Sequence, residues 1–423
     1  MAKKTTIALT ASTLAATLLL TACSTKAEES SGGGGSSDSG SLQTDLGVTD
    51  DEITLLQLAD LSGVFKTISL AFGAGIQVWE DEINAAGGIC DRDINVLTQD
   101  TVYKVDNAVP LYEQYKNDAI GMIGLGGSHI LAALKQKITS ENMLTVPGSW
   151  ASVNLESPAV LMVGQTYDVE MINGLSYLQG EGLINDGDTI GHIYTDSEYG
   201  QGGLMGSKAY AKDHNMTIVE APLSASDTDL TATITKLKSD GVTAIAITTP
   251  PAALGSAAVQ NVQQALNVPI IGNNPSFAPN LLADPGVEAA LSHYYMSSSV
   301  VPFDSGNAKA DEILEKTKEF SQDEANIGII NGYTWGLAWG AVLEKACDNG
   351  DMTREGVIKA KGEVDSVDSE DLTGALDFTV PGAPTSREAY IVHADKSKPG
   401  ALAMSKELFA SPEAEDYKAP AQK

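Results

Sequence analysis

The feature that most constrains the fold is an alternation of short apolar runs with amphipathic helical patterns, which occurs twice along the chain. In the first series, strand-like runs at 53–58, 94–98, 120–124 and 143–146 alternate with helical patterns at 68–83, 105–115 and 130–139. In the second series, strand-like runs at 190–195, 217–220, 244–247 and 269–271 alternate with helical patterns at 203–214, 230–239 and 252–266. Such βα units predict parallel sheets covered by helices. We therefore expect an α/β chain of two doubly wound parallel-sheet lobes, completed by helices at 309–320 and 333–347.

The charge balance and the missing motifs exclude several classes of function. The chain of 423 residues has 56 acidic and 26 basic residues, a formal net charge of −30. Because nucleic acids are bound by Lys and Arg surfaces, we expect no nucleic-acid partner. The sequence has no G-x-S-x-G, P-loop, H-E-x-x-H or complete G-x-G-x-x-G motif, and its five histidines are dispersed. The acidic run at 365–371 lacks EF-hand spacing and predicts a solvated loop. We expect a protein that is not an enzyme and needs neither cofactor nor metal.

The N-terminus has the pattern of an export signal. Lys3 and Lys4 precede an apolar run at 7–20 that is too short to favour a membrane-spanning helix. The run ends in Leu20-Thr21-Ala22-Cys23, which resembles a bacterial lipobox with Cys23 as the lipid acceptor; the alternative is an ordinary secretion signal before a chance cysteine. We predict a lipoprotein signal peptide at 1–22, a flexible Gly/Ser tether at 23–45, and an extracytoplasmic lipoprotein anchored to the membrane only through its lipid.

The loops that follow the predicted strands are the candidates for ligand binding, because ligands of open parallel sheets gather at the carboxyl ends of the strands. These loops are 61–63, 124–128, 147–150, 196–200, 249–251 and 273–276. Ser128 directly precedes an apolar helix. Its hydroxyl either binds an anionic oxygen together with nearby backbone N–H groups, or caps its own helix.

Three short segments resemble motifs of one known family. They are Leu61-Ser62-Gly63, Glu82-Ile83-Asn84-Ala85-Ala86-Gly87-Gly88-Ile89 and Tyr199-Gly200-Gln201-Gly202. Together with the order of strands and helices from about Asp51 to about His393, they resemble the branched-chain amino-acid-binding (Leu/Ile/Val-type) solute-binding proteins of ABC importers. The resemblance implies a type I periplasmic-binding fold, in which three crossing segments join two lobes around a ligand cleft. It places lobe 1 at 46–165 and 297–385, and lobe 2 at 166–296 and 386–423.

The resemblance also implies a set of ligand-binding residues. The anchors of the ligand carboxylate fall at Ser128, at the backbone N–H of Gly148 and at Trp150. In the second lobe, the family's tyrosines fall at Tyr199 and at Pro250 or Pro251, and its ammonium-binding carboxylate falls at Asn274. The predicted ligand-binding residues are Ser128, Gly148, Ser149, Trp150, Tyr199, Pro250, Pro251 and Asn274.

The replacement at Asn274 bears on the solute, because a neutral amide does not balance a buried ammonium group. The expected solute is a small polar molecule: an amino acid, urea or a short amide, captured by closure of the two lobes. The expected partners are ABC permease subunits. The alternative function is a ligand-sensing receptor module of the same fold that feeds a signalling system.

The remaining two cysteines form an even pair. With Cys23 assigned to the lipid, Cys90 and Cys347 can form a disulfide in an oxidising compartment. Cys90 follows the first helix of the first lobe, and the resemblance places the helix that ends at Cys347 in the same lobe. We predict a bridge between them, with two separate buried thiols as the alternative, and we expect a monomer.

Overall fold

The computed structural model describes residues 42–224, 227–321 and 323–422, which belong to one compact unit, Ser41–Lys423. The predicted signal peptide, Cys23 and the tether as far as residue 41 lie outside the described residues. The last part of the predicted tether differs from the expectation, because β1 (Gln43–Thr44) pairs with β11 (Asp351–Met352). In the described part of the chain, no helix is both long and apolar enough to span a membrane.

The first lobe is built on a four-stranded parallel sheet with the strand order β3-β2-β4-β5. Its strands are β2 (Glu52–Ala59), β3 (Asp93–Asp100), β4 (Gly121–Leu125) and β5 (Thr145–Pro147). Its helices are α1 (Lys66–Ala85), α2 (Val105–Tyr115), α3 (Ser128–Ser140), α9 (Ala308–Thr317), α10 (Gly328–Asp348) and α11 (Arg354–Lys361). The central strands β2 and β4 are almost wholly buried, which explains why they are nearly continuous apolar runs in the sequence.

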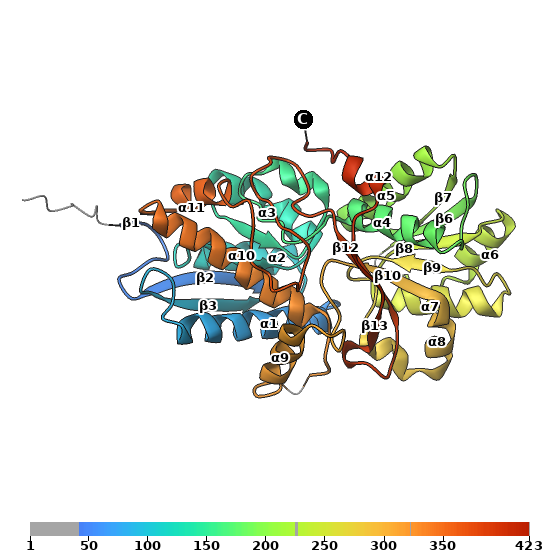
Figure 1. The fold of residues 1–423 in the computed structure, drawn as a ribbon, viewed down its shortest axis with the longest axis horizontal. Helices are drawn as coiled ribbons and strands as arrows, with labels where there is room; N and C mark the ends of the chain where they lie inside the picture. Colours follow the sequence, from blue (N-terminus) through green and yellow to red (C-terminus); the bar gives the residue numbers. More distant parts are fainter. Residues whose placement is uncertain (1–41, 225–226, 322, 423) are drawn as a thin grey trace, which may run out of the picture. The chain divides into compact units, whose positions relative to one another are not determined.

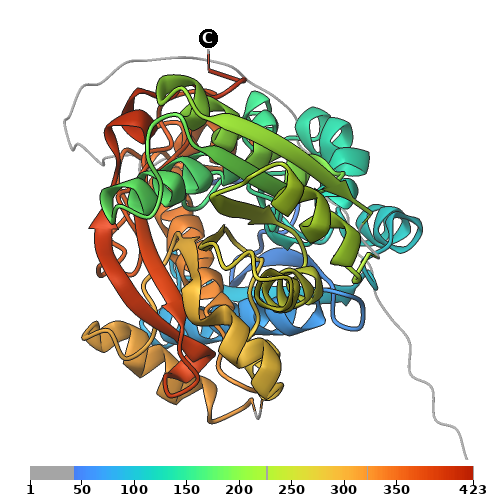
Figure 2. The ribbon, with the colours of Figure 1, turned by 90° about the vertical axis from the view of Figure 1, so that its right-hand side faces the viewer.

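The second lobe is built on a seven-stranded sheet with the order β13-β12-β10-β9-β8-β6-β7. Its strands are β6 (Thr189–Thr195), β7 (Thr217–Leu223), β8 (Ala244–Thr248), β9 (Ile270–Gly272), β10 (Tyr294–Ser298), β12 (Ala389–Ala394) and β13 (Leu402–Phe409). Its helices are α4 (Tyr167–Gly180), α5 (Glu198–Asp213), α6 (Thr231–Ser239), α7 (Pro251–Gln263), α8 (Pro285–Ala290) and α12 (Pro412–Asp416). The predicted α/β architecture of two lobes with parallel sheets is confirmed (Figure 1). Two further strands, β12 and β13, were not predicted from the sequence; they add an antiparallel hairpin at one edge of the second sheet (Figure 2).

The chain passes between the lobes three times: after β5, after β10 and before β12. These crossing segments are hydrogen-bonded to one another and to neighbouring chain. The hydroxyl of Thr385 donates to the carbonyl oxygens of Met162 and Gly164, both at 2.8 Å. The hydroxyl of Thr373 donates to the carbonyl oxygen of Ser299 at 2.6 Å. Three adjacent crossings therefore connect the two lobes.

The segment Tyr199–Gly202 was expected in a loop, but it lies in the first turn of α5, which begins at Glu198. Glycines make a weak helix signal in a sequence, since each costs about 1 kcal/mol relative to alanine. Here they allow close packing: a Cβ on Gly200 would overlap the Thr195 carbonyl oxygen, and one on Gly206 would overlap that of Asp168. Tertiary contacts therefore outweigh the weak helix propensity of this segment.

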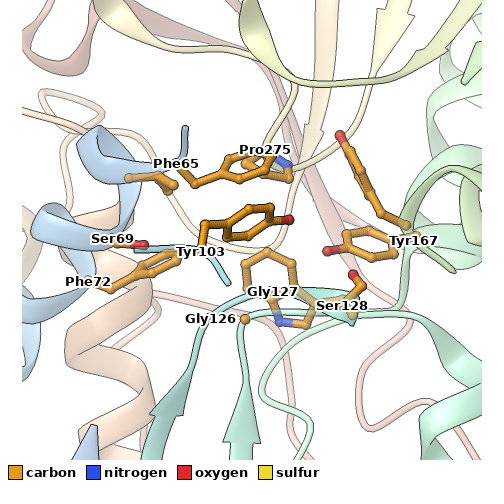
Figure 3. A pocket seen from close by; sticks show the side chains of 13 residues that line it. Phe65, Ser69, Phe72, Tyr103, Gly126, Gly127, Ser128, Tyr167 and Pro275 are labelled. Carbon is orange, nitrogen blue, oxygen red and sulfur yellow. The ribbon is translucent and has the colours of Figure 1, made fainter. Parts of the chain in front are cut away.

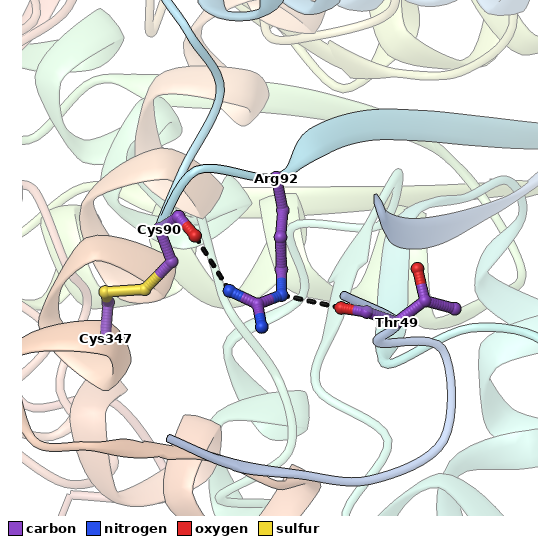
Figure 4. The surroundings of a disulfide bond; sticks show 4 residues. All are labelled: Thr49, Cys90, Arg92 and Cys347. Carbon is purple, nitrogen blue, oxygen red and sulfur yellow. Dashed lines mark hydrogen bonds between the residues drawn. A yellow bond between two sulfur atoms is a disulfide. The ribbon is translucent and has the colours of Figure 1, made fainter. Parts of the chain in front are cut away.

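The predicted disulfide is confirmed: Cys90 and Cys347 are joined, with their Cα atoms 6.1 Å apart (Figure 4). The bond ties the C-terminal end of α10 to the turn that leads into β3. Arg92 holds this turn, since its guanidinium donates to the carbonyl oxygens of Cys90 at 2.7 Å and Thr49 at 2.6 Å. The turn is thus fixed on both sides.

Candidate functional site

A cavity between the two lobes lies at the carboxyl ends of strands from both sheets (Figure 3). Its lining residues are Phe65, Ile68, Ser69, Phe72, Tyr103, Gly126, Gly127, Ser128, Gly148 and Trp150 from the first lobe, and Tyr167, Tyr199 and Pro275 from the second. The free space inside it is about 40 Å³. That is enough for water but too little for a solute of several carbon atoms, so the lobes must separate to admit one.

The wall of the first lobe is a cluster of aromatic rings. The ring centroids of Phe72 and Trp335 are 4.5 Å apart, and those of Trp150 and Trp335 are 6.3 Å apart. The indole N–H of Trp150 donates to the Val163 carbonyl oxygen at 3.1 Å, which satisfies the one polar atom of a side chain that is 1% exposed. This wall offers the cavity apolar surface.

Two tyrosines form the facing wall. Tyr167 begins α4, directly after the first crossing segment, and its ring centroid lies 4.8 Å from that of Tyr199 and 5.9 Å from that of Trp150. The hydroxyl of Tyr199 donates to the Thr249 carbonyl oxygen at 3.3 Å. Burial raises the pKa values of both phenols, so that each remains a neutral hydroxyl at physiological pH.

The loop after β3 brings Tyr103 to the cavity in an unusual backbone conformation. Val102 and Tyr103 have φ values of 53° and 55°, a region that β-branched and bulky side chains rarely occupy. The Tyr103 ring packs against Phe65, with centroids 5.0 Å apart, and against His129, at 4.5 Å. Backbone strain of this kind persists where surrounding contacts enforce it, commonly at ligand-binding loops.

Asp60 and Asp100 hold these loops in place. Asp60 accepts hydrogen bonds from the backbone N–H groups of Gly63 at 2.6 Å and Phe65 at 2.8 Å. Asp100 accepts from the N–H groups of Leu61 at 3.0 Å and Val102 at 2.8 Å, and from the Ser62 hydroxyl at 2.6 Å. Both carboxylates thus stabilise the loop conformations through hydrogen bonds, and neither residue lines the cavity.

Ser128 brings a side-chain hydroxyl to the cavity at the start of a helix. It is the first residue of α3, and Gly127, with φ of 103°, occupies the capping position. The Ser128 hydroxyl does not cap the helix; it donates to the Ser149 hydroxyl at 2.8 Å. The N–H groups of Ser128 and His129 have no backbone acceptor in the part of the chain that the structure describes. A helix N-terminus with free N–H groups favours an anionic oxygen.

The structure brings together some of the predicted site residues and not others. Ser128, Gly148, Trp150 and Tyr199 line the cavity, and Ser149 lies behind Ser128, fully buried. The Gly148 N–H, which is predicted to anchor the ligand, donates to the Leu125 carbonyl oxygen at 2.8 Å, where β4 and β5 end.

Three residues predicted to bind the ligand from the second lobe lie outside this cavity lining, so their role stays a prediction. Pro250, Pro251 and Asn274 are not among the described residues that line the cavity. Pro250 occupies the N-cap position of α7, and Pro251 is its first residue, where proline is favoured because a first-turn N–H has no helical partner. The side chain of Asn274 is directed to Glu170 instead, and its neighbour Pro275 lines the cavity.

Sequence reasoning missed Phe65, Phe72, Tyr103 and Tyr167. Phe72 lies within the helical pattern at 68–83, where an aromatic residue usually faces the core, and nothing in the sequence marks Tyr167 as the residue that follows a crossing segment. The sequence does not reveal the positive φ of Tyr103 either, because glycine or asparagine is the usual residue at such positions.

The lining contains no Asp, Glu, Lys, Arg or His. A buried acid, Glu170, lies on α4 one turn after Tyr167. Burial raises the pKa of Glu170 well above its usual value, although hydrogen bonds from Asn274 lower it in part. Burial thus favours the protonated form of its carboxyl group. In the described ranges, no group of three His, Cys, Asp or Glu side chains is placed to hold a metal ion.

Comparisons with known proteins agree with this geometry. A family model described as periplasmic binding protein matches residues 52–399. A solved fatty acid ABC transporter substrate-binding protein from Thermomonospora curvata is 31% identical, with a TM-score of 0.85 over 90% of this chain and 97% of that one.

More distant structures share the fold alone. A branched chain amino acid ABC transporter protein from Thermus thermophilus with bound valine is 15% identical, with a TM-score of 0.74 over 87% of this chain and 98% of that one. A leucine binding protein from Thermotoga maritima is also 15% identical, with a TM-score of 0.70 over 85% of this chain and 99% of that one. A search of curated protein sequences finds no match.

Proposed function

The chain belongs to the periplasmic binding protein family and is the substrate-binding component of an ABC transporter, and from this premise we propose that its solute is a small monocarboxylate with an apolar body. As a member of this family it is not an enzyme and works outside the cytoplasm. The proposal rests on one observation above all: the cavity has aromatic walls, free N–H groups at a helix N-terminus, and no charged side chain.

The two ends of such a solute match the two kinds of surface. The N-terminus of α3, with the Ser128 hydroxyl, would receive the carboxylate through hydrogen bonds and the helix dipole. The rings of Phe72, Trp150 and Tyr167 would cover the apolar body, since aromatic side chains offer large apolar contact areas. Each lobe supplies part of the enclosure, so closure completes the site.

An amino acid, urea or a short amide fits less well than the sequence analysis expected. The ammonium group of an amino acid needs a counter-charge when it is buried, whereas burial disfavours the charged form of the nearby Glu170, whose carboxyl group is bonded to Asn274. Urea and short amides would leave the aromatic walls without an apolar partner. The similarity to a protein named for fatty acids supports the same choice.

Calorimetry with a matched panel tests the proposal. Butyrate, hexanoate, octanoate and benzoate form one arm, and leucine, valine, urea and acetamide form the other. We expect binding in the first arm only. Ser128→Ala should weaken carboxylate binding by about 1–2 kcal/mol, as expected for an unpaired hydrogen-bonding group. Ser140→Ala, at the exposed far end of the same helix, is the control. Tighter binding of leucine or urea than of hexanoate would refute the assignment.

We also propose that lipid at Cys23 anchors the protein to the membrane, which is consistent with its role at a transporter. Intact-mass analysis of the native protein should show a chain that begins with an acylated Cys23. A secreted product that retains an unmodified cysteine would contradict the anchor.

A further inference from the structure

A second cavity lies in the first lobe, away from the cleft. It is enclosed by the C-terminal end of α11, the segment 155–160 and the segment 378–385, and its volume is about 210 Å³. Its walls are mostly apolar, with Leu155, Pro158, Ile358, Phe378, Val380 and Pro381 among them. It shares no lining residue with the cleft.

One cation lines this cavity. Lys361 is the last residue of α11, and its ammonium group donates to the carbonyl oxygens of Pro158 and Val160, both at 3.0 Å. In the described ranges no carboxylate lies within 4.0 Å of this ammonium. The one acid of the lining, Glu156, pairs with Lys135 at 2.8 Å. Burial lowers the pKa of Lys361 to about 8, because no nearby acid stabilises its charge.

A structural role accounts for part of this arrangement. Ala159 and Leu161 pair with Thr145, so the carbonyl groups of Pro158 and Val160 lie at the free edge of the first sheet. Lys361 covers that edge, as lysines often do. The two carbonyl oxygens accept two of the three N–H groups of the ammonium, and neither oxygen carries a negative charge that could balance the cation. The partly buried cation therefore keeps one donor and an unmet preference for an anion.

We propose that this cavity is a second binding site, for a small carboxylate whose apolar body fills the crevice and whose carboxylate pairs with Lys361. Its volume is below the roughly 300–1,000 Å³ of pockets for drug-sized ligands, which favours a compact molecule such as benzoate. Inorganic phosphate fits poorly, because the apolar walls would leave most of its oxygens without hydrogen-bond donors. The site is independent of the solute proposed for the cleft.

Nuclear magnetic resonance of lysine side chains labelled at Cε tests the site with benzoate as the probe. Lys361→Met identifies the Lys361 signal, and Lys359, exposed on the same helix, is the internal control. We expect benzoate to shift the Lys361 signal saturably and to raise the pKa of Lys361, because an opposite charge favours the charged amine. Acetate, which has no apolar body, should do so far more weakly. An unchanged Lys361 signal, or equal effects of acetate and benzoate, would overturn the proposal.

A second variant removes the site without deleting the lysine. Val380 lines the cavity and is 46% exposed, so Val380→Glu would offer Lys361 a carboxylate from within the chain. We expect this variant to abolish the response to benzoate. Val262→Glu, at a position 49% exposed on α7, should respond like the wild-type protein. A folded Val380→Glu protein with the wild-type response would refute the site, whereas Ser128→Ala in the cleft should leave the response unchanged.

Discussion

The side-chain amide of Asn274 donates a hydrogen bond to Oε1 of the buried Glu170, with nitrogen and oxygen 3.3 Å apart. Asn274 is 2% exposed, and Glu170 is fully buried. The position at which the resemblance implies an ammonium-binding carboxylate therefore carries an amide that donates a hydrogen bond to a buried acid. The two side chains are thus bonded to each other, and neither is among the residues that line the cavity.

This pairing predicts the effect of Asn274→Asp. The substitution places two carboxyl groups together in a buried site, where like charges cannot both form, so at least one must remain protonated. We expect a loss of about 1–3 kcal/mol in the free energy of unfolding, the range for a buried group that loses its partner. A raised folded-state pKa makes stability fall as pH rises, so the loss should be larger at neutral pH than at mildly acidic pH.

Urea denaturation at the two pH values measures the effect, with the exposed Asn280→Asp as the control. If Asn274→Asp and Asn280→Asp are equally stable at neutral pH, the contact between Asn274 and Glu170 does not contribute to the free energy of unfolding.

Tyr103 is predicted to limit the size of the solute. Its ring closes the cavity beside Phe65 and is held there by a strained loop. Tyr103→Ala should raise the ratio of the affinities for octanoate and butyrate about tenfold, which corresponds to about 1.4 kcal/mol. Tyr103→Phe keeps the ring and should leave the ratio unchanged. Calorimetry with octanoate and butyrate measures this ratio. An unchanged ratio in the alanine variant would show that the bound solute does not reach Tyr103.

The sequence was informative where a property is local. The buried strands β2 and β4 are apolar runs, and Ser128 was found because it follows a strand and precedes a helix. The aromatic walls were not found, because Phe72 and Tyr167 come from elements far apart in the chain that meet only through the packing of the lobes. The side chains of Asn274 and Glu170 were missed as a pair for the same reason.

The disulfide is predicted to stabilise the protein more than it shapes the cleft. It closes a loop with a sequence separation of 257 residues, for which chain entropy gives about 5 kcal/mol as an upper value. Replacement of both Cys90 and Cys347 by serine should lower the free energy of unfolding by up to that amount. Solute affinity should change little, since Arg92 still holds the turn. Two free thiols in the denatured, unreduced wild-type protein would contradict the bridge.

The packing of α1 against α10 predicts opposite effects for two Gly→Ala changes. A Cβ on Gly332 would overlap the Phe72 carbonyl oxygen, so Gly332→Ala should push the helices apart and cost about 1–3 kcal/mol. Gly180, at the end of α4, has nothing within 4 Å of such a Cβ. Gly180→Ala should stabilise by about 0.5–1 kcal/mol through helix propensity. Thermal unfolding of both variants tests the pair, and a loss of equal size in each would reject this account.

His214 is predicted to make the docking of the C-terminal helix depend on pH. Its Nδ1 lies 2.9 Å from Asp186 Oδ1, and its Nε2 lies 3.1 Å from Glu413 Oε1 on α12. Its ring stacks on Tyr210, with centroids 4.3 Å apart, and Gln179 Nε2 lies 3.2 Å from its Nδ1. Burial alone would lower the pKa of His214, but the two carboxylates outweigh burial and raise it.

A raised histidine pKa contributes stability that is fully present below the unfolded value of about 6.5 and is lost as pH rises through the folded value. His214→Gln should therefore cost up to about 1 kcal/mol near pH 6, as for partly exposed ion pairs, and less near pH 8.5. Urea denaturation at both pH values gives this difference, and the protection of α12 amides relative to their intrinsic exchange rates should fall with rising pH in the wild-type protein but not in the variant. His293→Gln, at an exposed position, controls for the loss of an imidazole. If the cost of His214→Gln is the same at both pH values, the contact is structural and carries no charge-dependent part.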